Sequence, residues 1–481
     1  MSERRRIALV LSLAIAAYLV CLRAYYVGFF NDDAYYVIGA RSIMHGRYAE
    51  LNAPGMPPLV NFLPGYSLLL APVAAVAGGA LWPYQLLSVA LMAAGVFFAW
   101  LYFDEAPPEA RSAAALAAAF CPLCLSMSGT VLSDVPLLAL FGAAYLLARE
   151  VWQRREVAPW LGLSALCGFA SLVRPTGFVL SAALVAALCL EGRWRNAALA
   201  AALGAALPGA FLLRNRLLTG RSLMYFVEAA DPAARGALGR VLLRNAAFYP
   251  KFLFVTTLFR WPAGGRFLEA FTIGLCVLAI ACAVREEESW EWRKLVQLSL
   301  LAFIAVHLPW SKQAGRYVLP LVPFAAGYVM WGLALLAREY GGGAGACWWA
   351  AALSVALSLS PALKIARASL HGGGEPARPP AETFDWLRAH ARPADVVASE
   401  MAGRVFLYTG LKTVQLKRLS QARWAVLLPN DAVMRTASGG TPFDPADLAD
   451  VERRLSRDPR WRRAFASHRD GSLVFESAAP R

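Results

Sequence analysis

Two adjacent carboxylates, Asp32 and Asp33, follow the first apolar block of the sequence. Adjacent carboxylates repel each other, which raises the pKa of one of them and suits it to take a proton from an alcohol. Carboxylates at a membrane edge are costly unless water solvates them or the protein uses them. Two interpretations stay open: a solvated loop that ends the block, or a site in which the pair serves as a general base or as a ligand of a metal or pyrophosphate.

A third carboxylate, Asp134, begins a later apolar block in the run Ser133-Asp134-Val135-Pro136. Ser or Asp just before a helix with proline in its first turn is a common N-cap. The same carboxylate is a candidate for a catalytic or metal site. The sequence leaves both roles open, and one residue can serve both.

Four basic residues stand at the ends of apolar blocks, on the membrane side predicted for these carboxylates: Arg174, Arg214, Lys312 and Arg316. Any one of them can be explained as a side chain that snorkels to lipid head groups. Guanidinium groups also bind phosphate in a bidentate way, and a leaving pyrophosphate or lipid phosphate needs such partners. Four basic positions on the side that bears three carboxylates favour a phosphate site.

Membrane helices must position these residues, because the composition differs from that of a soluble enzyme. The chain is 58% hydrophobic and 16% charged, whereas soluble domains carry about 25% charged residues. Charged residues make up 13% of residues 1–363 and 27% of residues 364–481. We therefore expect a polytopic domain over 1–363, a linker over 364–380 and a soluble domain over 381–481.

About 20 apolar residues are needed to cross the hydrocarbon core of a bilayer. Eleven blocks are predicted as spans: 7–27, 82–102, 112–130, 134–149, 158–173, 176–191, 197–213, 267–284, 295–310, 317–337 and 346–363. The long connections 28–81 and 214–266 are expected outside the membrane, each with a helix at its surface. The predicted fold class is an all-α polytopic membrane protein of about 11 transmembrane helices with a small α/β C-terminal domain.

The tail alternates segments typical of helices and strands. Helices are expected over 382–390, 404–409 and 447–456, and strands over 395–399, 424–428 and 472–476. This alternation is typical of a small α/β domain. The tail holds no glycine-rich phosphate loop, catalytic triad spacing or metal-ligand cluster, so we expect it to be accessory.

Lys and Arg in short loops indicate the orientation. Arg4, Arg5 and Arg6 predict a cytoplasmic N-terminus, and an odd number of spans then places the tail and the acidic pair outside. The acidic loop 103–111 opposes this trend. The net charge of +15 does not indicate nucleic-acid binding, because the basic residues lie in short clusters between apolar blocks. We expect a multi-pass protein of a bacterial cytoplasmic (inner) membrane with an extracytoplasmic active face.

In order along residues 1–335, these motifs resemble those of the GT-C superfamily of polytopic glycosyltransferases, particularly the protein-mannosyltransferase and aminoarabinose-transferase-like group (glycosyltransferase family 39-like). The matching residues are Asp32-Asp33 with Tyr36 and Ala40, Pro57-Pro58-Leu59, Pro64-Gly65-Tyr66-Ser67-Leu68-Leu69, Ser133-Asp134-Val135-Pro136, Arg174-Pro175, Arg214-Asn215 and Gly315-Arg316-Tyr317-Val318-Leu319-Pro320. The pair here is Asp-Asp where the family often has Asp-Glu.

The resemblance implies sugar transfer from a polyprenyl-phosphate-linked donor to a lipid, polysaccharide or protein acceptor at the outer face of the membrane. It implies that Asp32 is the general base, and that Asp33 and Asp134 organise the site or a divalent metal. The donor phosphate would be held by Arg174, Arg214, Arg316 and Lys312. A single base also predicts inversion at the anomeric carbon.

Two other classes of function compete with this prediction. A transporter or flippase of lipid-linked saccharides should show internal repeats and charges near the middle of its spans, whereas this chain has no visible repeat and its charges gather at span ends. A membrane anchor that presents the tail as a binding module needs neither eleven spans nor the acidic pair. The sequence does not specify the sugar, the acceptor or any partner subunit.

Overall fold

The structure is a computed structural model that describes residues 2–154, 157–220, 238–260, 265–286, 292–310, 313–343, 345–370, 379–428 and 445–478. Its contacts divide the chain into two units. The first, helical unit comprises Met1–Leu22, Leu86–Gly129 and Ser133–Ala366, and the second comprises Arg23–Gln85, Thr130–Leu132 and Arg367–Arg481. Contacts thus group the first external segment of the sequence with the tail.

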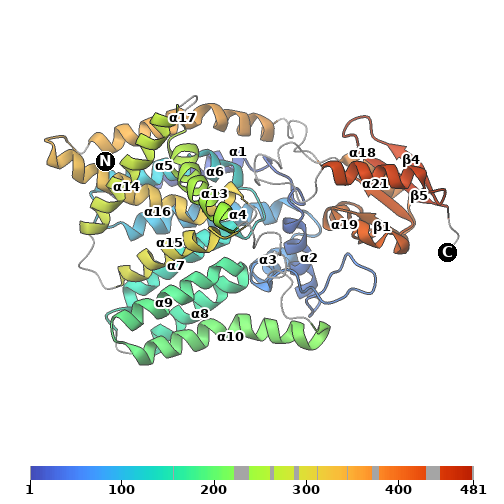
Figure 1. The fold of residues 1–481 in the computed structure, drawn as a ribbon, viewed down its shortest axis with the longest axis horizontal. Coiled ribbons are helices and arrows are strands. Elements are labelled where there is room, and N and C mark those ends of the chain that lie inside the picture. The colour runs from blue at the N-terminus through green and yellow to red at the C-terminus, as the bar shows by residue number, and fades with distance from the viewer. Residues whose placement is uncertain are drawn as a thin grey trace. The chain divides into compact units, whose positions relative to one another are not determined.

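The described residues of the first unit are mainly helical (Figure 1). Its helices are α1 (Glu3–Val20), α4 (Trp82–Tyr102, whose first turn belongs to the second unit), α5 (Pro108–Ala119), α6 (Pro122–Met127), α7 (Asp134–Val151), α8 (Val157–Val173), η1 (Pro175–Gly177), α9 (Phe178–Leu190), α10 (Trp194–Thr219), α13 (Leu238–Pro250), the π-helical η2 (Lys251–Leu258), α14 (Arg266–Glu286), α15 (Arg293–His307), η3 (Gly315–Leu321), α16 (Val322–Glu339) and α17 (Gly345–Leu370, which ends in the second unit).

Helices occupy the positions of all eleven predicted spans, but they differ in length. Within the described residues, five are long and apolar enough to cross a membrane: Trp82–Tyr102, Trp194–Thr219, Arg266–Glu286, Gly315–Glu339 and Gly345–Leu370. The block predicted over 112–130 is divided between α5 and α6, because Pro122 starts a new helix after Cys121. The count of eleven transmembrane helices therefore stays a prediction.

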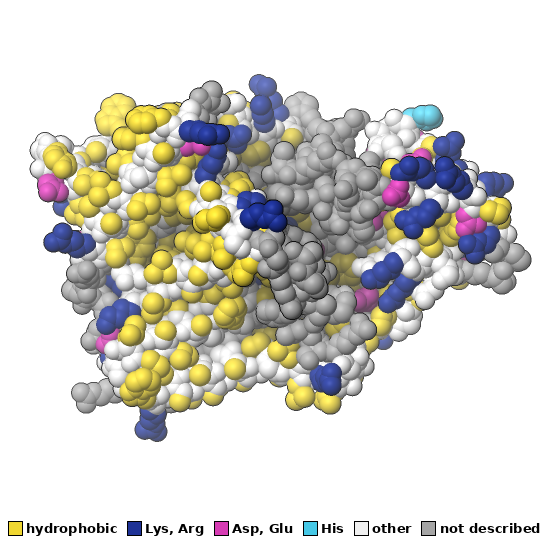
Figure 2. Space-filling view, in the orientation of Figure 1, with side chains coloured by type: hydrophobic (Ala, Val, Ile, Leu, Met, Phe, Trp, Pro, Cys, Tyr) yellow, Lys and Arg dark blue, Asp and Glu magenta, His cyan; other side chains and the backbone are white. Residues whose placement is uncertain are grey.

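Burial separates central helices from peripheral ones. In the apolar window of η3 and α16, 83% of residues are buried, compared with 22% for each of α10, α14 and α17. Outward side chains on the peripheral helices are large and apolar, such as Leu217 at 76% exposed and Phe267 at 84% exposed. Figure 2 shows such hydrophobic side chains over the visible face of this unit. Exposed apolar surface of this extent fits contact with lipid.

Alternation of the predicted spans makes the loops 103–111, 149–157, 191–196, 285–294 and 338–345 cytoplasmic, and ion pairs join the first four of these in the first unit. The acidic segment 103–107, part of the loop 103–111 that opposed the sequence trend, supplies the carboxylate partners of Arg149 and Arg293. Three ion pairs join these loops: Arg149–Asp104 at 2.6 Å, Arg293–Glu105 at 2.8 Å, and Lys294–Glu191. Loops that lie on one side of the membrane must meet at one end of the helices, and these ion pairs fit that requirement.

The second unit combines two helices of the first external segment with the folded tail. Its elements are α2 (Asp32–Met44), α3 (Pro64–Val76), α18 (Ala381–His390), β1 (Val396–Ser399), α19 (Ala402–Thr409), β2 (Lys412–Val414), η4 (Leu416–Gln421), β3 (Trp424–Leu427), α21 (Pro445–Arg457), β4 (Trp461–Ala466) and β5 (Leu473–Ser477). The surface helix predicted within 28–81, at the apolar run 63–77, is α3, whereas α2 was not predicted as a helix.

The tail contains the predicted small α/β fold. In the described part of the tail, five strands run in the order β2-β1-β3-β5-β4, with β1 parallel to β2 and β3, and β5 antiparallel to β3 and β4. Central strands β1 and β3 are buried throughout, and Ala398 pairs with Ala425. The sequence analysis missed β2 and β4, because β2 has three residues and β4 is rich in exposed arginine.

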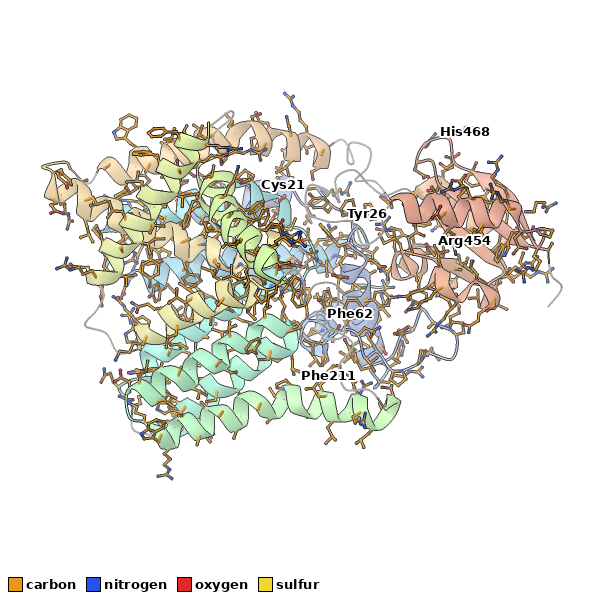
Figure 3. The ribbon with its side chains drawn as sticks, in the orientation of Figure 1. Cys21, Tyr26, Phe62, Phe211, Arg454 and His468 are labelled. Atoms are coloured by element: carbon orange, nitrogen blue, oxygen red, sulfur yellow. The ribbon has the colours of Figure 1, made fainter. Side chains whose placement is uncertain are left out.

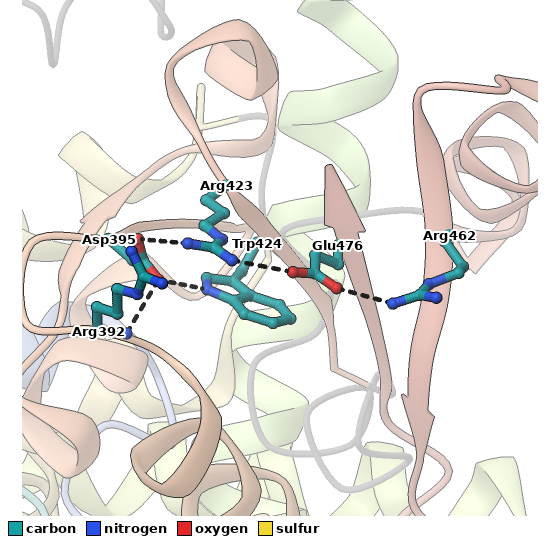
Figure 4. A network of polar contacts seen from close by, with 6 residues as sticks. All are labelled: Arg392, Asp395, Arg423, Trp424, Arg462 and Glu476. Carbon is teal, nitrogen blue, oxygen red and sulfur yellow. Dashed lines mark hydrogen bonds and ion pairs between the residues drawn. The ribbon is translucent and has the colours of Figure 1, made fainter. Parts of the chain in front are cut away.

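A polar network crosses one edge of this sheet (Figure 4). Its members are Arg392, Asp395, Arg423, Trp424, Arg462 and Glu476. The indole of Trp424 donates to Asp395 at 3.0 Å, and Arg423 donates to Glu476 at 3.2 Å. These contacts join β3 to the start of β1 and to β5, and Arg462 of β4 donates to Glu476 at 3.2 Å.

Candidate functional site

The acidic pair lies in a tight turn followed by the first turn of α2. Gly28 and Asn31 both have left-handed backbone, with φ of +98° and 62°. Asp32 and Asp33 are the first two residues of the helix, where negative charge interacts favourably with the helix dipole. The turn at residues 28–31 therefore leads directly into α2, and both carboxylates lie in the first turn of that helix.

Asp33 is buried and holds the turn together. Its side chain is 1% exposed, and its two oxygens accept hydrogen bonds from the backbone N–H groups of Gly28 at 2.7 Å and Ala34 at 3.0 Å. Burial raises the pKa of Asp33 to about 7, although the Gly28 N–H and the positive charge of Arg404 act to lower it. The solvated-loop interpretation is therefore wrong for Asp33.

Asp32 is the more accessible member of the pair. It is half-buried, whereas Asp33 is enclosed. Since a base must reach the proton of an incoming acceptor, accessibility favours Asp32 over Asp33 for that role.

The motif that follows the acidic pair packs against the proline motif. The Ser67 hydroxyl on α3 donates to the Tyr36 carbonyl at 3.0 Å, and the rings of Tyr36 and Tyr66 lie 5.1 Å apart. A Cβ on Gly39 would come within 2.5 Å of Ser67 Oγ, so a side chain there would separate the two helices. These two sequence motifs together form one α2–α3 pair.

Asp134 forms the second cluster, in the first unit. Asp134 is 1% exposed. Its Oδ2 lies 2.9 Å from Arg174 Nη1 and 3.9 Å from Arg316 Nε. Arg174 also donates to Ser133 Oγ at 3.2 Å. Asp134 is the first residue of α7 rather than its N-cap, and Ser133 at the cap makes no capping hydrogen bond with its side chain. The N-cap interpretation is wrong for Asp134, and pairing with arginine is its observed role.

Two tight turns deliver the arginines to this cluster. Arg174 is extended between α8 and η1, and a Cβ on Gly177 would lie 2.2 Å from the Ala170 carbonyl oxygen, so only glycine fits. Gly315, at the start of η3, lies directly against the ring of Phe252. The glycines beside the two arginines therefore serve close packing.

Two ring side chains, Tyr317 and His307, lie beside these arginines. The Tyr317 ring centre is 5.0 Å from the Arg174 guanidinium carbon and 5.8 Å from that of Arg316. His307 lies at the end of α15 with its ring 5.2 Å from that of Tyr317, and its Nε2 is buried with no hydrogen-bond partner among the described residues. Tyr317 belongs to the sequence motif that contains Arg316, whereas no motif included His307.

The remaining predicted phosphate ligands are placed differently. Arg214 lies on α10, where it donates to Asn215 Oδ1 at 2.8 Å and faces the ring of Phe211 at 5.8 Å (Phe211 is labelled in Figure 3). Lys312 lies outside the described residues. The structure thus brings Arg174 and Arg316 to one carboxylate, and their phosphate role stays a prediction.

The metal expected at Asp33 or Asp134 does not fit the donors around these residues. No group of three or more His, Cys, Asp or Glu side chains suited to a metal occurs in the described parts of the chain. Both oxygens of Asp33 accept backbone N–H groups, and Asp134 faces two guanidinium groups that would repel a cation. We therefore assign no chemical step to a metal.

Comparison with known proteins gives one partial family match. Residues 57–213 match the family described as dolichyl-phosphate-mannose-protein mannosyltransferase. This segment contains the proline motif, Asp134 and Arg174. No curated protein matches the chain.

Solved structures match over a far larger part of the chain. ArnT from Cupriavidus metallidurans, bound to undecaprenyl phosphate, has a TM-score of 0.62 and 12% identity over 99% of each chain. Its apo structure has a TM-score of 0.60 and 13% identity over the same share. AglB, an oligosaccharyltransferase from Archaeoglobus fulgidus in complex with an inhibitory peptide and a dolichol-phosphate, has a TM-score of 0.53 and 13% identity over 89% of this chain and 70% of its own.

This chain has the GT-C fold. The candidate residues lie at element ends: Asp32 and Asp33 at the start of α2, Asp134 at the start of α7, Arg174 directly after α8 and Arg316 at the start of η3. With its apolar helices, the GT-C chain is a multi-pass membrane protein.

Proposed function

We propose that this GT-C protein transfers a sugar from a polyprenyl-phosphate-linked donor to an acceptor at the extracytoplasmic face of a bacterial cytoplasmic membrane. The observation that carries the proposal is the buried Asp134–Arg174–Arg316 cluster in a unit with an apolar outer surface. Two guanidinium groups on one carboxylate leave a net positive charge that suits a phosphate. The matched structures of ArnT and AglB hold undecaprenyl phosphate and dolichol-phosphate.

The proposed reaction is a single displacement. Asp32 takes the proton from the acceptor hydroxyl, whose oxygen forms a bond to the anomeric carbon of the sugar. The bond between that carbon and the phosphate oxygen breaks, and the electron pair leaves with the polyprenyl phosphate. Arg174 and Arg316 stabilise the charge that develops on this leaving group. One base and one displacement give inversion at the anomeric carbon.

The other candidate residues support these steps. Asp33 orders the turn that carries Asp32 through its two backbone hydrogen bonds. Asp134 holds the two guanidinium groups in place before the donor arrives, which lowers the cost of organising them around a phosphate. Arg214 and Lys312 are proposed as further phosphate contacts.

The test uses the full chain in proteoliposomes with labelled polyprenyl-phosphate sugars and a membrane extract as the source of acceptor. We expect polyprenyl phosphate to be released and label to appear in acceptor. Asp32→Asn should lower this rate by about 10²-fold or more, as expected for loss of a general base. The matched control Asp385→Asn changes an exposed tail carboxylate paired with Arg388 and should keep the parent rate.

The outcomes separate the candidate functions. Full activity in Asp32→Asn would show that Asp32 is not the base. Movement of intact donor between leaflets, without release of polyprenyl phosphate, would instead indicate a transporter. If the parent chain consumed none of the donors, the glycosyltransferase proposal would be wrong.

A further inference from the structure

A tail arginine contacts the turn that carries the acidic pair. Arg404 lies on α19 and is 3% exposed. Its Nε donates to the Gly28 carbonyl at 2.7 Å and its Nη2 donates to the Phe29 carbonyl at 2.6 Å. The guanidinium carbon is 5.2 Å from the centre of the Tyr26 ring (labelled in Figure 3). One side chain from the tail therefore binds two consecutive carbonyl groups of the turn.

Gly28 links this arginine to the acidic pair. Its carbonyl accepts from Arg404, while its N–H donates to Asp33 Oδ2 at 2.7 Å. Its φ is +98°, and a Cβ there would lie 3.2 Å from Arg404 Cγ. A change in the position of Arg404 is therefore transmitted to Asp33 through a single residue.

Other contacts bring α19 against the same turn. A Cβ on Gly403 would meet the Ala34 Cβ at 3.1 Å, and the Tyr408 hydroxyl donates to the Val27 carbonyl at 2.9 Å. Helix α19 thus packs against both the turn and the first turn of α2. Contacts with α19 therefore occur on both sides of Asp32 and Asp33, from Val27 to Ala34.

The two carbonyl groups that Arg404 contacts suit arginine better than lysine. Two carbonyl oxygens on successive residues match the fixed fork of a guanidinium group, whereas a lysine ammonium is a point charge on a flexible stem. The charge of Arg404 also lowers the pKa of Asp33 and so favours its ionised form, which accepts hydrogen bonds more strongly. Both effects stabilise the turn.

We propose that Arg404 is a positioning residue for the acidic pair, so that the tail forms part of the machinery that orients Asp32 and Asp33. This inference rests on the proposed function, because it assigns the turn a role in sugar transfer. It replaces the expectation from the sequence that the tail is accessory.

A second tail side chain provides a matched control. Lys412 Nζ donates to the Leu51 carbonyl at 2.6 Å, so it also joins the tail to the first external segment. Its hydrogen bond goes to Leu51 and not to a residue of the acidic turn, and the backbone hydrogen bond from Thr413 N–H to the Asn52 carbonyl at 2.7 Å remains when Lys412 is changed. A residue that merely attaches the tail should behave like Lys412.

The experiment compares Arg404→Met, Arg404→Lys and Lys412→Met in the full chain, with the polyprenyl-phosphate sugar that the parent consumes fastest. We expect Arg404→Met to lower kcat about 10- to 100-fold, as misplacement of a catalytic group does, with the donor KM changed less than about threefold. Arg404→Lys should recover part of kcat. Lys412→Met should keep kcat within about twofold of the parent.

Hydrogen exchange of the same proteins gives a readout that needs no activity. Peptides covering residues 24–36 should exchange faster in Arg404→Met and not in Lys412→Met, with exchange in β1 and β3 unchanged as proof that the tail is folded. Equal loss of kcat in both Met variants, or a change in KM alone, would overturn the inference. So would unchanged exchange over 24–36, even if the parent chain transferred no sugar and the proposed function had failed.

If Arg404→Met disturbs β1 or β3, Tyr408→Phe replaces it. This variant removes only the hydrogen bond to the Val27 carbonyl on the same turn. Faster exchange over 24–36 together with a lower kcat in Tyr408→Phe would support the inference. Parent-like exchange and kcat in this variant and in Arg404→Lys would contradict it.

Discussion

Buried charge is the main feature of the candidate site at the level of single residues. Asp134 is 1% exposed and has arginine on two sides, at 2.9 and 3.9 Å. Removing one partner of such a buried pair is strongly destabilising, because it leaves an uncompensated charge. The arrangement therefore holds positive charge in an apolar unit before any phosphate binds.

Arg174→Lys and Arg316→Lys test the phosphate role of these guanidinium groups. Lysine keeps the charge but loses bidentate binding, so we expect the donor KM to rise about tenfold, which corresponds to roughly 1.4 kcal/mol of lost binding. The control is Arg149→Lys, which alters another arginine–aspartate pair, that with Asp104 at 2.6 Å, at the loop end of the unit. Steady-state kinetics with varied donor check this. A parent-like KM in both site variants would remove these arginines from the donor site.

The pKa of Asp33 predicts a pH dependence. Burial raises this pKa to about 7, so the carboxyl becomes protonated as the pH falls from 8 to 6. The protonated form accepts the N–H groups of Gly28 and Ala34 more weakly, and the turn that carries Asp32 loosens. We expect transfer at pH 6 to be about tenfold slower than at pH 8, because the ionised fraction falls by that factor.

Two variants test whether titration of Asp33 causes this loss of activity between pH 8 and pH 6. Asp33→Asn cannot titrate and should give a flat profile between pH 6 and 8, at whatever rate remains. Asp385→Asn, in the exposed tail pair with Arg388, should keep the parent profile. An unchanged acid limb in Asp33→Asn would assign the titration to another group.

At the level of elements, small residues decide how closely the helices pack. A Cβ on Gly332 of α16 would lie 1.8 Å from the Ala279 carbonyl oxygen on α14, so the two backbones touch there. Helix pairs in membranes commonly rely on such close approach, because burial from lipid offers little hydrophobic gain. The position of η3 and Arg316, directly before α16, depends on this packing.

Gly332→Ala should therefore destabilise the first unit, by about 1–3 kcal/mol or more, because backbone atoms have no room to move aside. The matched control is Gly274→Ala on α14, where a Cβ meets nothing within 4 Å. Alanine there should not destabilise the protein, and its higher helix propensity should raise stability by up to about 1 kcal/mol. Thermal unfolding of the two variants in detergent measures the difference. Equal midpoints would show that α14 and α16 do not pack in this way.

At the scale of the whole molecule, the loop ion pairs support one consistent sidedness. The loops that contain Asp104, Arg149, Glu191 and Arg293 lie at one end of the first unit, as alternating spans require. Basic residues near membrane ends favour the cytoplasmic side. We therefore predict that these loops are cytoplasmic and that the candidate site and the tail are extracytoplasmic.

A reporter fusion tests this orientation directly. Alkaline phosphatase, which is active only outside the cytoplasm, should be active when fused to the C-terminus and inactive when fused after Gly192. Green fluorescent protein at the same two positions should give the opposite pattern. An inactive phosphatase at the C-terminus, with a fluorescent counterpart, would reverse the orientation and place the acidic pair on the wrong side for the proposed donor.

The sequence by itself determined the apolar blocks, the helical and α/β character of the two parts, and the residue types of the candidate site. These features depend on local composition and periodicity, so helices stand where blocks were predicted and β1, β3 and β5 match the predicted strands. Helix α2 was not predicted, because the polar residues Asp32 and Asp33 at its start are typical of the loop that ends a span.

Only the tertiary structure decided which charges are paired. Asp134 lies 40 residues before Arg174 and much farther from Arg316 in sequence, and Arg404 is separated from Gly28 by most of the chain, so no local pattern links them. The same holds for the acidic loop 103–107, because only the structure shows that its carboxylates pair with Arg149 and Arg293. Pairing of charges depends on folding that brings distant segments within a few ångströms, where desolvation makes each unpaired charge costly.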